Sequence, residues 1–171
     1  MSNHQGRSLQ DRQTQGRDLR ALVDAANDLA ARRSAGALEP EHLLIAMAAD
    51  TRSSGGQFLV EAGLTAEKLE QMLDAERARS LGAAGVGTFS AIDLVATPRR
   101  TRPKIARTSR EAFDRGFRVG GHAIQPTTLN LVVGILMPDL GTVARMFEIA
   151  GLDRHQLLGR ATAEVVKGKR R

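Results

Sequence analysis

Apolar residues recur along the first half of the chain at the spacing of one helix face, and almost no segment alternates between apolar and polar residues as a half-buried strand does. This pattern predicts four short helices between residues 18 and 79. Their ends carry residues that favour helix boundaries, namely Asp18 and Thr65 as N-caps, Pro40 in a first turn and Gly63 after a C-terminus.

The same order of signals returns in the second half of the chain. Residues 147–153 repeat the pattern of residues 59–65 at an offset of 88, with one capping residue replaced by another. Pro126 opens an apolar segment that resembles the one after Pro40, at an offset of 86. The chain is therefore predicted to contain an internal duplication of a four-helix unit.

These patterns predict an all-α protein in which the two copies pack together as one domain with pseudo-twofold symmetry, because a copy of about 60 residues buries too little surface alone. Repeat one is expected at residues 18–79 and repeat two at residues 102–160. Between them, residues 80–101 contain glycine and proline with little periodicity and are expected to be a linker. A flexible arm over residues 1–17 and a basic tail over residues 161–171 complete the predicted organisation.

The chain has 25 basic and 19 acidic residues, a net charge of +6, but the excess is concentrated in two places. Five basic residues lie between Arg99 and Arg107 and four between Lys167 and Arg171, and without them acidic residues outnumber basic ones. A DNA-binding or transcriptional role through these segments is one function class that the pattern allows. Because the chain has no Trp or Tyr to stack on bases, we expect at most weak, sequence-independent binding to nucleic acid.

The sequence lacks the residues and motifs that most enzymatic chemistry requires. The absence of cysteine excludes disulfides, thiolate catalysis and cysteine metal sites, and favours an intracellular, cytoplasmic protein. The four histidines have no metal-ligand spacing, no Gly-x-x-x-x-Gly-Lys phosphate loop occurs, and no segment is apolar for the length of a membrane span. We therefore expect a protein that is not an enzyme, needs no metal or cofactor and does not enter a membrane.

Glu41-His42-Leu43-Leu44 resembles the Glu-His-Leu-Leu segment in the N-terminal repeat domain of the Clp AAA+ unfoldases, particularly the ClpC type. In the second copy, Thr97-Pro98-Arg99 and Ser109-Arg110-Glu111-Ala112 are similar to the corresponding segments of that family, so the resemblance covers about residues 17–160. It implies a duplicated Clp repeat fold. Because the ATPase that follows this domain in the family is not found here, the resemblance implies a stand-alone recognition domain.

The resemblance also implies which residues bind ligand. In ClpC-type domains the glutamate equivalent to Glu41 helps to hold the guanidinium group of phosphoarginine, while backbone amides and the helix end receive the phosphate. Arg20, Thr97 and Arg99 are the other candidate ligand-binding residues. Thr127 stands where the second copy would carry the glutamate, so a matching second site is not expected. A carboxylate at Glu41 also complements the positive end of a helix, and a purely structural role is the alternative.

The expected function is recognition of proteins or peptides, namely degradation substrates, adaptor proteins or a Clp unfoldase, with an effect on Clp-dependent proteolysis. ClpC-type domains of actinobacteria bind cyclic peptide antibiotics near the first helix and the start of the second repeat, so sequestration of such compounds is a variant of this hypothesis. The alternative is a DNA-binding or transcriptional regulator that acts through the basic linker and tail. Clp subunits or DNA that copurify with the chain would distinguish the two classes.

Overall fold

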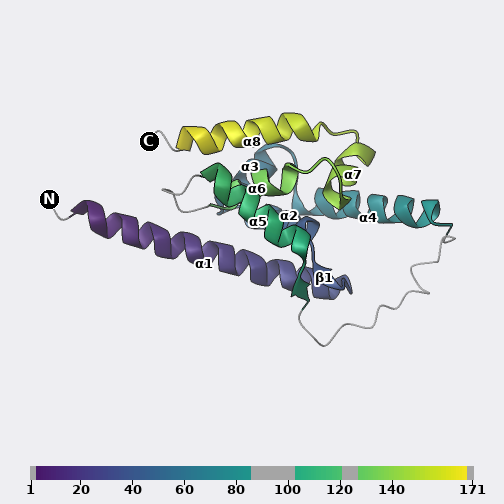
Figure 1. Ribbon diagram of the computed structural model, residues 1–171, viewed down its shortest axis with the longest axis horizontal. Coiled ribbons are helices and arrows are strands. Elements are labelled where there is room, and N and C mark those ends of the chain that lie inside the picture. Colours follow the sequence, from purple (N-terminus) through teal and green to yellow (C-terminus); the bar gives the residue numbers. More distant parts are fainter. Residues whose placement is uncertain (1–2, 86–102, 121–126, 169–171) are drawn as a thin grey trace.

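The computed structural model describes residues 3–85, 103–120 and 127–168, with side chains of the first helix described from Arg17 onward. In these ranges the all-α prediction is confirmed, because the chain forms eight α-helices and one pair of two-residue strands (Figure 1). The elements are α1 (Asn3–Arg32), β1 (Ala37–Leu38), α2 (Pro40–Ala49), α3 (Ser54–Glu61), α4 (Ala66–Ala83), β2 (Lys104–Ile105), α5 (Arg107–Gly120), α6 (Thr128–Leu136), α7 (Thr142–Ile149) and α8 (Arg154–Gly168).

The helix ends follow the local sequence signals. Pro40 is the first residue of α2, and the Thr65 side chain caps α4 by accepting a hydrogen bond from the backbone N–H of Lys68 at 3.2 Å. Gly63 and Gly151 follow α3 and α7 with φ angles of 73° and 65°, which glycine adopts without the steric cost of a Cβ atom. The boundary roles predicted for Pro40, Gly63 and Thr65 are confirmed, whereas the N-cap role predicted for Asp18 is wrong, because α1 begins at Asn3 and continues through this residue.

Three segments are more helical than the sequence predicts. Helix α1 begins at Asn3 within the expected flexible arm, α4 continues to Ala83 within the expected linker, and α8 continues to Gly168 within the expected tail. Ala161 and Val165 are buried, so the start of the expected tail belongs to the packed domain. The prediction required an apolar stripe, whereas a helix that has already formed extends through polar residues of good helix propensity at little cost.

A single offset relates the second, third and fourth helices of the two copies. Helices α2, α3 and α4 begin 88 residues before α6, α7 and α8. The offset of 86 predicted for the segment after Pro40 is wrong, because α6 is capped by Thr127, which is the counterpart of Glu39 at the N-cap of α2. Pro126, which was expected to open this helix, lies outside the described residues.

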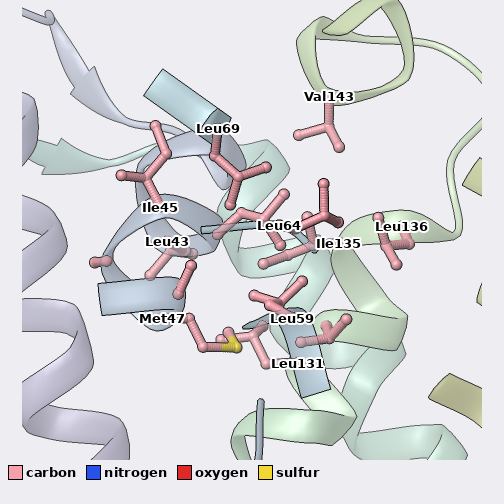
Figure 2. Close-up of a cluster of buried hydrophobic side chains, with 14 of the residues drawn as sticks. Leu43, Ile45, Met47, Leu59, Leu64, Leu69, Leu131, Ile135, Leu136 and Val143 are labelled. Carbon is pink, nitrogen blue, oxygen red and sulfur yellow. The ribbon is translucent and has the colours of Figure 1, made fainter. Parts of the chain in front are cut away.

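Both copies contribute to one hydrophobic core. Figure 2 shows side chains of α2 and α3 meeting those of α6 in a single cluster. Its almost fully buried members include Leu43, Met47, Leu59, Leu69, Leu131, Ile135 and Leu136. Because burial of such side chains is the dominant favourable contribution to folding, the two copies form one domain, as the sequence predicts.

Helices α1 and α8 lie on opposite sides of the molecule, with α2, α5 and α6 between them (Figure 1). The short strand pair then determines how the two copies meet near α2. Strand β1 pairs in parallel with β2 and so brings the start of α5 next to the start of α2. The Ser109 hydroxyl donates to the carbonyl of Leu38 at 2.7 Å, and the Thr108 hydroxyl donates to the carboxylate of Glu39. The first turn of α2 is thus held against a helix of the other copy.

Candidate functional site

A cavity of about 390 Å³ lies where the first turn of α2 meets α5, the start of α7 and the loop before α7. Its volume falls within the usual range of small-ligand sites. Both copies supply its walls, which include Pro40 and Glu41 from α2, Thr108, Glu111 and Arg115 from α5, and Leu140, Gly141, Val143 and Arg145 from α7 and the loop before it. The cavity therefore exists only when the two copies are packed together.

Glu41 is the buried acid of this cavity, with 6% of its surface exposed. Burial penalises the charged form and raises the pKa of Glu41 to about 7, an effect that the charge of Glu39 reinforces and that the residue's own backbone N–H and Arg77 oppose. No other side chain among the described residues forms a hydrogen bond or ion pair with this carboxyl group. A buried acid without a side-chain partner is costly when ionised, so a cation that enters the cavity would be bound favourably.

Two arginines also line the cavity, and both are already paired. Arg145 Nε donates to Glu76 Oε1 at 2.7 Å, and Glu76 is itself only 3% exposed. Arg115 Nε donates to the carbonyl of Gly134 at 3.0 Å, and its Nη1 lies 3.9 Å from a carboxylate oxygen of Glu111. These arginines are therefore fixed parts of the wall and do not neutralise Glu41.

His42 follows Glu41 but faces the protein interior, where it is 1% exposed. Its Nδ1 accepts a hydrogen bond from the backbone N–H of Glu39 at 3.1 Å, which satisfies an amide at the start of α2. Burial lowers the pKa of His42 to about 4, and the charges of Arg77 and Arg33 lower it further. His42 is thus a neutral capping residue. The described part of the chain contains no group of three or more potential metal ligands.

The second copy lacks a carboxylate at the position of Glu41. At the offset of 88 the counterpart of Glu41 is Leu129. It is not Thr127, which the sequence predicts when Pro40 is paired with Pro126. The capping groups support this register, because Asn130 Oδ1 accepts from the backbone N–H of Thr127 at 3.0 Å just as His42 does in the first copy. An aliphatic side chain at this position cannot pair with a guanidinium group.

Of the other predicted ligand residues, the structure describes Arg20 alone. Arg20 is exposed on α1 and is not part of the cavity wall. Thr97 and Arg99 lie outside the described residues. The sequence analysis missed the residues of α5 and α7 that complete the cavity, such as Thr108 and Arg145. The order of the repeats was the one feature of the sequence that could have indicated these residues, because contacts between helices far apart in the chain leave no local pattern.

The comparisons with known proteins agree with the first copy of the fold. Residues 17–94 match the family model of the Clp repeat (R) N-terminal domain, a stretch that contains the second half of α1 and all of α2, α3 and α4. No curated protein matches the chain. In the described ranges, no helix is both long enough and apolar enough to cross a membrane. The match covers less than half of the 171 residues and supports a Clp repeat N-terminal domain over residues 17–94.

Proposed function

We propose that this chain is a recognition module related to the N-terminal domains of Clp unfoldases, and that the cavity at Glu41 receives a cationic side chain of a partner protein. The observation that carries the proposal is the Glu41 carboxyl group, buried in the cavity wall with no partner side chain among the described residues. A guanidinium group matches a carboxylate in charge and in geometry. Its arrival would supply the missing partner and favour the ionised form of the acid.

Phosphoarginine is the ligand class that we assign to the cavity. Its guanidinium group would face Glu41, and its phosphoryl group would meet the first turn of α7, where the N-cap Gly141 provides no side chain to the amides that follow. Amides at a helix N-terminus attract phosphate. Pro40 has no N–H, so α2 itself offers one amide fewer for this purpose.

Binding of this kind would connect the chain to degradation substrates, adaptor proteins or a Clp unfoldase and so modulate Clp-dependent proteolysis. The role requires no catalysis by the chain. The family resemblance names three candidate ligand residues besides Glu41, and of these the structure describes Arg20. Arg20 does not line the cavity. The proposal therefore does not extend to cyclic peptide antibiotics. No observation favours the DNA-binding alternative, because six of the nine basic residues in its two segments lie outside the described ranges.

Titration calorimetry with free phosphoarginine should show binding that weakens by about one to two decades in Glu41→Gln. The expected loss is that of a charge-assisted hydrogen bond, roughly 1.5–3 kcal/mol. At pH 6 the wild type should also release protons on binding, because Glu41 is largely protonated there before the ligand arrives. This release appears as a binding heat that depends on the ionisation enthalpy of the buffer.

Glu67→Gln is the matched control for this titration, since it removes an exposed carboxylate from the first turn of α4. The control should bind phosphoarginine as the wild type does and release the same number of protons. Equal affinity in Glu41→Gln and the wild type would contradict the proposed role of Glu41.

A further inference from the structure

The cavity at Glu41 lies at the junction between the starts of α2 and α7. The fold contains a second, equivalent junction, because α6 and α3 are the counterparts of α2 and α7. At this second junction the two helix starts touch. The backbone N–H of Gly55 donates to Thr128 Oγ1 at 2.8 Å, and Ser54 Oγ lies 3.1 Å from the same oxygen. The backbone N–H of Leu129 in turn donates to Ser54 Oγ at 3.4 Å. Each helix thus presents a hydroxyl group to the N-terminus of the other, as a capping residue does.

Glycine makes this close approach possible. A Cβ atom on Gly55 would lie 2.9 Å from the carbonyl carbon and oxygen of Thr128 and 2.3 Å from the sulfur of Met47, which is too close for either contact. The counterpart of Gly55 is Val143, and the counterpart of Thr128 is Pro40, which has no hydroxyl group. Val143 and Pro40 both line the cavity, which lies between the starts of α2 and α7.

A hollow of about 400 Å³ lies beside the second junction and has Thr128 in its wall. Alanines of α1 and α2 form much of its wall, together with Thr128 and Ser53. Its charged members are Asp50 and Arg52, whose side chains pair with each other at 3.2 Å. Leu129, the counterpart of Glu41, is not part of this wall. Among the residues that line the hollow, none is a buried acid able to receive a guanidinium group.

We infer that the α3–α6 junction is a closed copy of the binding cavity, in which the Thr128 hydroxyl takes the place of a ligand, so that each chain binds a single ligand. The inference takes its ligand from the proposed function, but the closure is a property of the fold. Gly55 and Thr128 are then the residues that set the number of sites. A partner that carries several modified side chains would be held at one point per chain, and tighter capture would need several chains.

Amide hydrogen exchange, followed by NMR, tests the closure without any ligand. The protection factor of the Gly55 amide, which is bonded to Thr128, should be at least about tenfold larger than that of Val143, its counterpart at the open cavity. Thr128→Val removes the hydroxyl at nearly constant volume and should abolish this protection. Thr162→Val is the control, because the Thr162 hydroxyl donates to the carbonyl of Leu158 within α8. Equal protection of Gly55 and Val143 in the wild type would overturn the inference.

Phosphoarginine titration tests the number of sites. We expect one site per chain in the wild type and an affinity that changes by less than about twofold in Thr128→Val. Two sites per chain, a ligand that slows exchange at Gly55, or clearly weaker binding in Thr128→Val would overturn the inference. If phosphoarginine does not bind at all, the proposed function fails, and the exchange measurement still decides whether the junction is closed.

Discussion

The Glu41→Gln variant should gain about 3 kcal/mol of stability relative to the wild type as the pH rises from 4.5 to 7. Over this range the folded protein keeps a proton on Glu41, because burial raises its pKa from 4.5 to about 7, whereas the unfolded chain has released it. The stability that Glu41 contributes is therefore complete below pH 4.5 and is lost as the pH rises through 7, at about 1.4 kcal/mol per pH unit. Glutamine does not titrate and removes this loss.

His42 has the opposite effect on the pH dependence of stability. Its pKa falls from 6.5 to about 4 in the folded protein, so the stability that it contributes is complete above pH 6.5 and is lost as the pH falls through 4. Between pH 4.5 and 6.5 the contributions of Glu41 and His42 nearly cancel. His42→Asn keeps a capping acceptor of the kind that Asn130 provides in the second copy, and its stability should fall as the pH rises.

Urea unfolding at several pH values, followed by circular dichroism, measures both slopes. The readout is how the difference in free energy of unfolding between variant and wild type changes with pH, because a packing change that is independent of pH cancels in this comparison. A difference for Glu41→Gln that stays constant from pH 4.5 to 7 would show that Glu41 ionises normally. That result would also remove the physical basis of the proposed binding site.

Alanine at Gly134 is expected to lower the free energy of unfolding by about 3 kcal/mol. Helix α6 contacts the backbone of α5 at this point, so a Cβ atom on Gly134 would lie 2.0 Å from the carbonyl oxygen of Ala112 and 2.7 Å from the backbone nitrogen of Gly116. Because these are backbone atoms, no side chain can rotate away, and the two helices must separate. In the first copy the counterpart is already an alanine, Ala46, in the helix that packs on α1.

Gly159→Ala is the matched control for Gly134→Ala. Gly159 is exposed on α8, and an added Cβ atom would meet no atom within 4 Å. Alanine has the better helix propensity, so this variant should be more stable than the wild type by about 0.5–1 kcal/mol. Thermal unfolding of both variants provides the comparison. If Gly134→Ala melts as the wild type does, the close approach of α5 and α6 is contradicted.

The helix ends can be predicted from the sequence because their causes are local. Pro40 suits a first turn since it lacks an N–H group, and Gly63 tolerates a positive φ angle, so each effect operates within a few residues. The register between the copies is harder to predict. Pro40 and Pro126 suggest an offset of 86, but α6 begins after its Thr127 cap and places Gly134 against α5. That packing depends on contacts between two helices, α5 and α6, and no signal within α6 alone indicates it.

The candidate site follows from the sequence only in part. The resemblance to Clp repeats indicates Glu41, and the structure places it in the wall of a cavity. Its raised pKa is not readable from the sequence, because the burial that causes it depends on helices of both copies. The same holds for Arg145, whose partner Glu76 lies 69 residues earlier in the chain. Arg20 carries a suitable charge but is exposed on α1 and does not line the cavity.

The difference between the two junctions depends on the joining of both repeats in one chain. In a symmetric homodimer of single-repeat subunits, every residue at one junction would recur at the other, so that both would be open or both closed. The fused chain escapes this constraint, because Gly55 and Val143 occupy equivalent positions in the same molecule. One junction can therefore join the two halves through direct contacts, while the equivalent junction keeps a cavity for the proposed ligand.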